Sequence, residues 1–589
     1  MLSEVNGVKS TASQTWKRQL NLNVSRKLKA LLAAVFFIAS SVVYGQQPAQ
    51  APTQVGLKPI LGYISTNWDK LTRSMTSCES IVDPKMQVAP VLYLPADFPN
   101  PAAVTKLQAD CKVDVEHLSK PITALGQIDM STIHQHGLLY LPNKYVVPGG
   151  RFNEMYGWDS YFTIRGLLED GRLDLAQGMV ENYFFEIEHY GAILNANRTY
   201  YLTRSHPPFL SSAIMAVYDA QKKSGKPDKA WLERAYGYLQ RDHALWTHEP
   251  HLAGDTGLSR YYDFGSGPAP EGLQDESGFY RRVIAYFVEH PDTADHYLVP
   301  SNSNTSATTY GAKYSIQVCD VATTMARPGC ETQHVVTLSN DYYKGDRSMR
   351  ESGYDISFRF GPYGAGTHHF APICLNSLLY KAETDLEKIA RTLGKNSEAE
   401  EWKSKAAARK AAINKYLWDE ERGMFFDYDF EKGERSTYVY VTTFFPLWAG
   451  LATPEQAKKL VANLPKLEQP GGVAMSTSAQ EAGVQWEYPW GWAPTHLPTV
   501  EGLRRYGFND EANRISYKFL TTVANNFRRE GFIREKYNVV TGSSEATITA
   551  GYQANVIGFG WTNGVFLVFL HALPAEMVDK LSTEQQTQK

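Results

Sequence analysis

Apolar side chains recur at helical spacing over long parts of this chain. Between Leu175 and Ile187 they return every third or fourth residue, which places them on one face of a helix. A second stripe runs from Leu375 to Leu393 and stops at Gly394, a residue typical of helix C-termini. Both stretches predict amphipathic helices that cover a core.

The second half of the chain continues the pattern. We expect further helices over residues 398–416, 454–463, 495–506 and 510–529. A short strand or loop is expected at residues 423–430, GMFFDYDF. Strands do not alternate with helices and no glycine-rich phosphate loop follows a strand, so a parallel α/β fold is not favoured. Periodicity predicts a mostly α protein, preceded over residues 57–144 by short helical pieces with proline-rich breaks.

Composition narrows the class of protein. Of the 589 residues, 43% are hydrophobic and 21% charged, which is ordinary for a soluble globular chain. The net charge of −3 favours neither nucleic acid nor an anionic membrane as a partner. Aromatic residues reach 12%, with 12 Trp and 35 Tyr, which suits carbohydrate binding. A chain this long needs a large closed fold rather than one small core.

The N-terminus predicts an export signal over residues 1–45. Basic residues at 26–29 precede an apolar run over residues 30–43, and Gly45 precedes the expected cleavage point. The run is short for a membrane span, although an uncleaved anchor is the alternative. We therefore expect a periplasmic or secreted protein without stable membrane insertion, and residues 46–57 as a disordered lead-in.

Cysteines and one irregular region complete the outline. In an oxidising compartment Cys78 with Cys111, and Cys319 with Cys330, are candidate disulfides, which leaves Cys374 as a small buried hydrophobic residue. None of the cysteines has metal-ligand spacing. Residues 280–346 show weak apolar periodicity and a low-complexity run, so we interpret them as an inserted excursion near the site or as a solvated loop.

A chemically dense stretch occupies residues 147–162, VPGGRFNEMYGWDSYF. Behind a Pro-Gly-Gly turn it supplies an arginine, two carboxylates and several aromatic residues. Aromatic faces cover the C–H face of a pyranose and charged groups take its hydroxyls, which favours a sugar site. The alternative is a helix N-terminus with its aromatic residues in the core and its charges paired on the surface.

This stretch resembles the first signature of the trehalases, inverting glycoside hydrolases that split α,α-trehalose into two glucoses. Residues 485–494, QWEYPWGWAP, resemble their second signature, with Glu487 where Asp is usual. The resemblance covers roughly residues 118–573. It implies an (α/α)6 barrel, or toroid, with a loop-built active site at one end. We accordingly expect the catalytic barrel over residues 58–575 and a polar tail over 576–589.

The resemblance also nominates the catalytic pair. Inversion requires one carboxyl that protonates the leaving oxygen and one carboxylate that activates water. Residues 351–359 are similar to the segment that carries the family's general acid, which implies that Asp355 is the acid, with Tyr354 in place of the usual Trp. Residues 534–538 are similar to the base segment, which implies Glu535 as the base. The alternatives are a helix cap at Asp355 and a surface pair of Glu535 with Lys536.

Further residues match the family's sugar-binding positions. They are Arg151, Trp158, Asp159, Asn195, Arg204, Ser205, His206, Glu271 and Gly353. His206 replaces the usual Gln. Residues 558–564, GFGWTNG, match closely, but Trp561 suits a ligand loop and a packing turn equally.

Three departures bear on the substrate. Ala269 stands where the family has an arginine, and Cys374 where it has an aspartate. The family's binding glutamate near residue 552 falls at Tyr552, unless Glu545 replaces it. A missing polar group in a site built for hydroxyls changes preference strongly.

The leading hypothesis is therefore an exported inverting trehalase that needs no cofactor or metal and acts as a monomer on a disaccharide. One alternative is a related hydrolase that acts on another α-glucoside. The other is a non-catalytic sugar-binding protein on the same scaffold, which loss of Asp355 or Glu535 would favour.

Overall fold

The two apolar stripes form helices, as their spacing predicts. A computed structural model describes residues 55–82, 89–271, 278–294, 296–300, 314–317, 333–551 and 555–587. The first stripe lies in α6 (Leu173–His189) and the second in α14 (Ile373–Leu393). Gly394 ends α14 with a φ of 81°, a left-handed conformation that favours glycine. The predicted signal over residues 1–45 lies outside the described residues.

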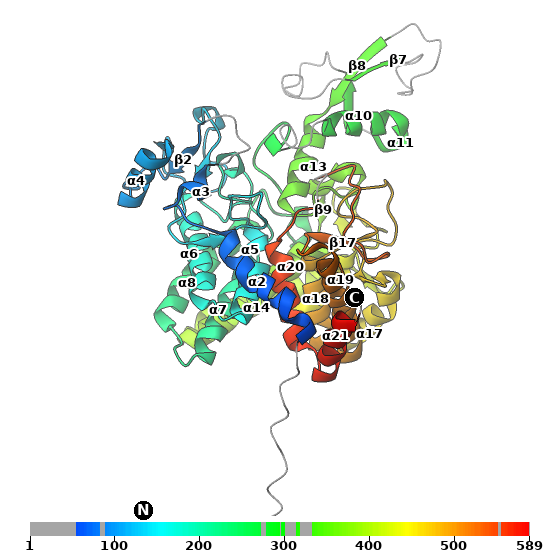
Figure 1. Ribbon diagram of the computed structural model, residues 1–589. Coiled ribbons are helices and arrows are strands. Elements are labelled where there is room, and N and C mark those ends of the chain that lie inside the picture. The colour runs from blue at the N-terminus through cyan, green and yellow to red at the C-terminus, as the bar shows by residue number, and fades with distance from the viewer. Residues whose placement is uncertain are drawn as a thin grey trace, which may run out of the picture. The chain divides into compact units, whose positions relative to one another are not determined.

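Six helices in the described part of the chain pack in a closed inner ring, and Figure 1 labels most of them. They are α5 (Gly157–Glu169), α7 (Leu210–Lys223), α14, α16 (Phe445–Ala449), α18 (Ala493–Arg505) and α20 (Gly560–Ala572). Each helix packs against the next, and α20 packs back against α5. The ring confirms the predicted (α/α)6 toroid. Helices in such a ring have protein on all sides, which is why α16 and most of α5 and α20 are buried all round.

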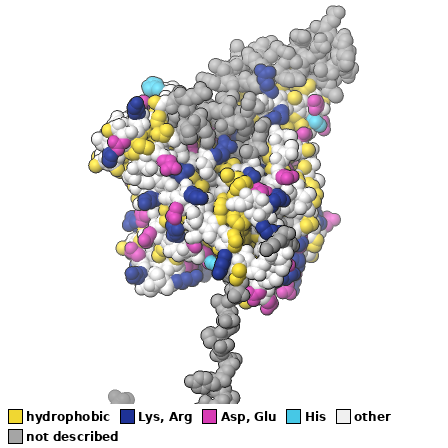
Figure 2. Space-filling view, viewed as in Figure 1, with side chains coloured by type: hydrophobic (Ala, Val, Ile, Leu, Met, Phe, Trp, Pro, Cys, Tyr) yellow, Lys and Arg dark blue, Asp and Glu magenta, His cyan; other side chains and the backbone are white. Residues whose placement is uncertain are grey.

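A second layer of helices surrounds the ring and exposes one polar face. It consists of α6, α8 (Lys229–Trp246), α15 (Asn396–Tyr416), α17 (Pro454–Asn463) and α19 (Asn509–Glu530). The expected boundaries of α15, α17, α18 and α19 are met within about two residues. Acidic and basic side chains are interspersed on the face shown in Figure 2.

Strands are short and connect the helices. Antiparallel pairs are β1 (Thr72–Arg73) with β5 (Tyr145–Val146), β10 (Trp418–Asp419) with β11 (Met424–Phe425), β14 (Glu468–Gln469) with β15 (Gly472–Val473), and β16 (Trp490–Trp492) with β17 (Lys536–Asn538). The three-stranded sheets are β3 (Asp114–His117), β2 (Val91–Leu94) and β4 (Leu138–Leu139); β13 (Glu434–Arg435), β12 (Tyr428–Asp429) and β9 (Phe370–Ala371); and β6 (Leu298–Pro300), β8 (Gln333–Leu338) and β7 (Tyr314–Gln317). The segment expected as a strand or loop at 423–430 contributes β11 and β12.

The first part of the described chain packs beside the ring. Helix α2 (Lys58–Leu71) contacts α19 and α20, while α3 (Cys78–Ile81) and α4 (Ala102–Cys111) contact each other. The Cys78–Cys111 disulfide joins α3 to α4 and confirms that pairing. Cys374 is free and buried, as expected, whereas Cys319 and Cys330 lie outside the described residues.

Two expectations about segment boundaries differ from the structure. Most of the polar tail expected over residues 576–589 belongs to α21 (Ala575–Thr587), because Val578 and Leu581 are buried against η1 (Val55–Leu57) and α19. Leu57, at the end of the expected disordered lead-in, is also buried. The few apolar residues of α21 form one narrow stripe. The segment as a whole is therefore predicted to be polar when only its own sequence is considered.

The interpretation of residues 280–346 as irregular is wrong at both ends. Helix α10 (Phe279–Glu289) buries one apolar face, and α13 (Asn340–Glu351) is buried along most of its length. Between them lie α11 (Pro291–Ala294) and the β6–β8–β7 sheet, at the top of Figure 1. The polar composition of α13 conceals its burial, since its charged side chains are paired inside the protein.

Two glycines allow α5 and α20 to approach closely. A Cβ atom on Gly166 would lie 2.3 Å from the Cα of Gly564, and one on Gly564 would lie 2.3 Å from the carbonyl oxygen of Phe162. Real side chains do not tolerate such contacts, so the helices would have to separate.

We therefore expect Gly564→Ala to lower the free energy of unfolding by about 1–3 kcal/mol, because a methyl group must be forced into a packed helix contact. Gly237→Ala is the matched control, since Gly237 is exposed within α8 and a Cβ atom there meets nothing within 4 Å. The control should be neutral or stabilising by up to about 1 kcal/mol. Urea unfolding of both variants measures the difference, and equal midpoints would contradict the packing argument.

Candidate active site

A cavity lies at the end of the ring where the inner helices begin. Trp158 and Asp159 open α5, Trp492 directly precedes α18 and Trp561 opens α20, and all four line the cavity. The segment before α7 adds His206. Residues at the N-termini of several inner helices therefore lie together at one cavity. Their positions in the sequence do not show this proximity.

Four carboxyl groups line this cavity, and one of them, Glu271, is paired with arginines. Asp355 and Glu535, the nominated acid and base, are joined there by Asp159. Burial raises the pKa of Asp159 well above its ordinary value, and the nearby charges of Glu535 and Asp355 raise it further. Asp159 is thus close enough to both nominated catalytic carboxyls for its pKa to respond to their charge.

Glu535 is held by a buried cation and by its own backbone. The ammonium Nζ of Lys536 lies 2.6 Å from Glu535 Oε2 and 4.6 Å from the centre of the Trp492 ring. The indole Nε1 of Trp561 donates to the carbonyl oxygen of Glu535 at 3.1 Å. The expected alternative, a surface pair of Glu535 with Lys536, is excluded because both side chains are buried.

The second signature holds the segment that carries Asp355. The side-chain amide of Gln485 donates to the backbone carbonyl of Asp355, and the N–H of Trp486 donates to the carbonyl of Ile356 at 3.2 Å. Strand β16, which ends this signature, pairs with β17 so that Trp492 lies opposite Lys536. The signature therefore bridges the nominated acid and base segments.

Glu487 completes this support. Its carboxylate accepts hydrogen bonds from the Ser357 hydroxyl at 3.0 Å and the Phe358 N–H at 2.8 Å. It also accepts from the hydroxyls of Ser476, at 2.7 Å, and Tyr438. Burial raises the pKa of Glu487, although these donors oppose the shift. Glu487 stands where the family usually has the shorter aspartate, and both of its carboxylate oxygens accept hydrogen bonds.

We expect Glu487→Ala to lower the free energy of unfolding by about 2–4 kcal/mol and to reduce kcat, because several buried donors lose their acceptor and the Asp355 segment loosens. Glu420→Ala is the control, since the Glu420 side chain is 75% exposed. Urea unfolding and steady-state kinetics measure the two effects. A Glu487→Ala protein as stable and active as the control would contradict the supporting role.

Paired charges form a polar wall of the cavity. The Arg204 guanidinium pairs with Glu271, and Arg350 lies 3.9 Å from Glu271 and 3.1 Å from Asp346. Burial would raise the pKa of Glu271, but Arg204 and Arg350 outweigh it and lower that pKa to about 2. Glu271 is therefore a fixed anionic acceptor beside two fixed guanidinium groups, a suitable partner set for sugar hydroxyls.

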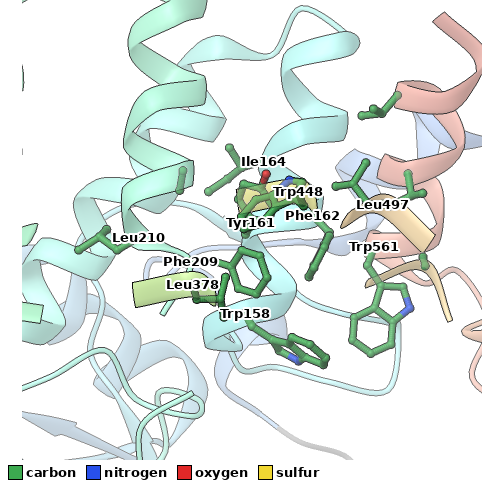
Figure 3. Close-up of a cluster of buried hydrophobic side chains, with 14 of the residues drawn as sticks. Trp158, Tyr161, Phe162, Ile164, Phe209, Leu210, Leu378, Trp448, Leu497 and Trp561 are labelled. Atoms are coloured by element: carbon green, nitrogen blue, oxygen red, sulfur yellow. The ribbon is translucent and has the colours of Figure 1, made fainter. Parts of the chain in front are cut away.

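Tryptophans supply the apolar wall. Trp486 stacks on Trp492 with ring centres 3.9 Å apart, and Trp158 lies 5.7 Å from Trp486 and 6.1 Å from Trp561. Figure 3 shows Trp158 and Trp561 among the buried side chains of the ring, with Phe162 and Phe209 beside Trp158. Trp561 both lines the cavity and packs, so its two expected roles are combined.

Most predicted binding residues meet at this cavity. The lining includes Trp158, Asp159, Asn195, Arg204, His206, Glu271 and Gly353. Gly353 has a φ of 75°, and a Cβ atom there would lie 2.8 Å from the Trp158 ring, so glycine is required. Burial lowers the pKa of His206 well below its usual value, and its Nδ1 accepts the Trp158 N–H at 3.1 Å.

Two predicted binding residues do not line the cavity. Ser205 donates its N–H to Glu351 and its hydroxyl to the carbonyl of Ile193 at 2.7 Å, so its polar atoms serve the fold. The guanidinium of Arg151 lies 5.2 Å from the centre of the Phe152 ring, and it is Phe152 that lines the cavity. Adjacency in a motif does not fix the direction of each side chain.

Sequence reasoning missed several lining residues. Arg350 lies just before the acid segment, Gln485 and Trp486 lie within the second signature, and Phe152 and Tyr156 lie within the first. The signal was present for all five, since each belongs to or directly adjoins a motif already singled out.

The departures from the family pattern have structural settings. Ala269 is buried and donates its N–H to the Tyr280 hydroxyl at 2.7 Å. Tyr354 packs edge-on against Trp158 and Trp486. Cys374 accepts a hydrogen bond from Arg359 at 3.4 Å. Glu545 is exposed and does not line the cavity, and Tyr552 lies outside the described residues.

A cavity with several carboxyls, a tryptophan wall and paired charges at one end of an α/α toroid defines a glycoside hydrolase. The family model described as trehalase matches residues 58–301 and 328–574. Over most of its length the chain is similar to cytosolic neutral trehalases. It is 34% identical to that of Saccharomyces cerevisiae over 85% of this chain and 70% of that one, and 35% identical to that of Neurospora crassa over 88% and 73%.

A solved structure, neutral trehalase Nth1 from Saccharomyces cerevisiae, matches 90% of this chain and 96% of its own, with a TM-score of 0.71 and 34% identity. The chain belongs to the trehalase family. The family match leaves residues 302–327 uncovered, a much shorter segment than the excursion expected over 280–346.

The expectation of a periplasmic or secreted protein is contradicted by these relatives, which are named cytosolic neutral trehalases. A few basic residues before an apolar run are a compositional pattern, and such a pattern specifies no compartment by itself. Among the residues that the structure describes, none of the helices is long and apolar enough to cross a membrane.

Proposed function

We propose that this enzyme hydrolyses α,α-trehalose to two glucose molecules with inversion of configuration. The observation that carries the proposal is the convergence of Asp355 and Glu535 on one cavity. They come from segments far apart in the chain, and Gln485 of the second signature bonds to the backbone of Asp355 and to Lys536, the neighbour of Glu535. An inverting pair is expected to be about 6.5–9.5 Å apart, to leave room for the attacking water.

Each residue has an assigned part in the reaction. Asp355 donates a proton to the glycosidic oxygen as the bond to the anomeric carbon breaks. Glu535 removes a proton from the water that attacks the opposite face of the same carbon. The Lys536 ammonium, 2.6 Å from Glu535 Oε2, holds this carboxylate in place. The protonation states of the two carboxyls are exchanged at the end and are restored through solvent.

The remaining lining residues are assigned to sugar binding. Trp158 and Trp486 offer apolar faces to the pyranose rings, while Arg204, Glu271 and Arg350 take hydroxyls. Asp159 is assigned to a hydroxyl beside the reacting carbon, because it faces both catalytic carboxyls. Burial of these charged groups favours a small, fully enclosed ligand, which suits a disaccharide.

The second candidate substrate is another α-glucoside. It is favoured by Ala269, which lacks the positive charge that an arginine gives the family at this position. Arg350 argues against it, since its guanidinium already lies beside Glu271. A non-catalytic sugar-binding role is not favoured, because both nominated carboxyls face the cavity.

A proton NMR time course of the purified chain with α,α-trehalose tests the proposal. The expected result is release of α- and β-glucose in equal amounts at early times, before mutarotation. Release of α-glucose alone would contradict inversion. No release from folded protein, with turnover of another α-glucoside such as maltose or kojibiose, would overturn trehalose as the substrate.

A further inference from the structure

Three histidines converge on one carboxylate at a place separate from the catalytic cavity. The Nε2 atom of His296 lies 2.7 Å from Asp341 Oδ2, and the Nε2 atom of His368 lies 3.0 Å from Asp341 Oδ1. The Nε2 atom of His369 lies 3.7 Å from the same Oδ1 atom. One ligand atom from each of Asp341, His368 and His369 falls within 4.8 Å of the others.

The four residues come from three separate segments of the chain. Asp341 lies in the first turn of α13, which Ser339 caps by accepting the Tyr342 N–H. His368 and His369 end the short helix η6 (Thr367–His369), which packs against α13. His296 lies between α11 and β6, beyond α10. The cluster therefore depends on the tertiary fold and is not a local motif.

The backbone around the cluster is fixed. Arg260 donates to the carbonyl of His368 at 3.0 Å, and the N–H of His369 donates to the carbonyl of Gly366 at 2.8 Å. The His368 and His369 rings lie 3.9 Å apart. His368 is nearly buried, whereas the side chains of His369 and His296 are 22% and 51% exposed. The partial exposure of His369 leaves a route for an ion from solvent to the anchored His368.

The simpler interpretation is a carboxylate that accepts hydrogen bonds from two histidines. It accounts for His296 and His368 but not for the approach of His369, which is too far from Asp341 for a hydrogen bond. In a tetrahedral zinc site with ligand bonds of about 2.0–2.1 Å, neighbouring ligand atoms lie about 3.3–3.4 Å apart. The observed separations from Asp341 Oδ1, 3.0 Å to His368 and 3.7 Å to His369, lie on both sides of that value.

We propose that Asp341, His368 and His369 form a binding site for a first-row divalent transition metal of the zinc class, with His296 holding the Asp341 carboxylate by a hydrogen bond to its second oxygen. Imidazole nitrogen with one carboxylate oxygen suits Zn²⁺, Co²⁺ and Ni²⁺, whereas Ca²⁺ and Mg²⁺ require mostly oxygen ligands. With three protein ligands the site leaves a fourth position for a water molecule.

The site has a specific place in the fold. Helix α13 begins beside Asp341 and carries Asp346 and Arg350 toward its other end, where Arg350 lines the catalytic cavity. A bound ion joins α13 to η6, and His296, from the connection between α10 and β8, holds the Asp341 carboxylate from its other side. Binding therefore stabilises the helix that supports the polar wall of the cavity.

The test uses the full chain after removal of metals with a chelator. Isothermal titration with Zn²⁺ is expected to show one site that His369→Ala and Asp341→Asn each weaken by about tenfold or more. His248→Ala is the control, because His248 is exposed and bonds only within its own helix end, to Ala244. The melting temperature should rise with Zn²⁺ in the native chain and in the control, but not in the two variants.

Two spectroscopic measurements make the result independent of stability. Co²⁺ loaded into the native chain should give the intense visible bands of four-coordinate cobalt, and these should disappear in His369→Ala. X-ray absorption spectra recorded at the zinc edge should show nitrogen and oxygen neighbours at about 2.0–2.1 Å, together with the outer-shell scattering that imidazole rings produce. Equal Zn²⁺ affinity in His369→Ala and His248→Ala, or cobalt bands typical of six water ligands, would overturn the proposal. Far-UV circular dichroism establishes that each variant is folded.

Discussion

Asp355→Asn is expected to reduce kcat on trehalose by about 10³-fold or more while the protein stays folded. The leaving group is a sugar alkoxide, which departs slowly unless a proton arrives as the bond breaks. An asparagine has nearly the same shape but has no proton of suitable acidity. The backbone carbonyl of residue 355, which accepts from Gln485, is unchanged, so the segment keeps its support.

α-Glucosyl fluoride separates the acid role from a structural one. Fluoride leaves without protonation, so Asp355→Asn should hydrolyse this substrate at a rate near that of the native chain. Steady-state kinetics on both substrates provide the measurement. Equal losses on trehalose and on the fluoride would mean that Asp355 maintains the cavity and does not act as an acid, and near-normal turnover of trehalose would exclude it from the reaction.

Glu535→Gln should cause a loss of similar size on both substrates, because activation of water is needed whichever group leaves. The change also removes the charge that faces the buried ammonium of Lys536, so some stability should be lost as well. Rates must therefore be compared per folded molecule, with the folded fraction taken from thermal unfolding.

Azide distinguishes a base from a residue that only maintains structure. In Glu535→Ala the shortened side chain leaves room for the anion, which attacks without giving up a proton. Added azide should restore consumption of the fluoride and yield β-glucosyl azide, the inverted product. Lys536→Met is the matched control: it removes the same ion pair but leaves the carboxylate, so azide should not change its rate. Absence of azide product in Glu535→Ala would contradict the assignment of Glu535.

Local pattern was sufficient where a segment's burial depends on one neighbouring surface. Helix α14 begins and ends where its apolar stripe and Gly394 indicate, because a one-sided amphipathic helix records its environment in its own sequence. The same reasoning failed for α13, whose charged residues are buried among partners from distant segments. Asp263 pairs with Arg347 across 84 positions of the chain, and no local pattern records that contact.

The candidate site divides in the same way. The motifs nominated Asp355 and Glu535 and led to part of the cavity lining, because a signature concentrates the chemistry of a site in a few short stretches. The direction of Arg151 and the use of Ser205 were not recoverable, since each depends on which neighbour takes its polar atoms. Glu487 shows the limit of prediction from sequence. The sequence showed that Glu487 replaces the usual aspartate, but it did not show the four hydrogen-bond donors, which come from three separate segments.

The sequence by itself determined the helical class, the family and the residues that belong to its signatures, because periodicity and motif are properties of short segments. The tertiary structure decided that the inner helices close into a ring, that their N-terminal ends share one cavity, and that Gln485 and Glu487 support the nominated acid. It also brought His296, His368 and His369 to Asp341. Each of these results depends on contacts between residues distant in the chain, and such contacts arise only when the whole core packs at once.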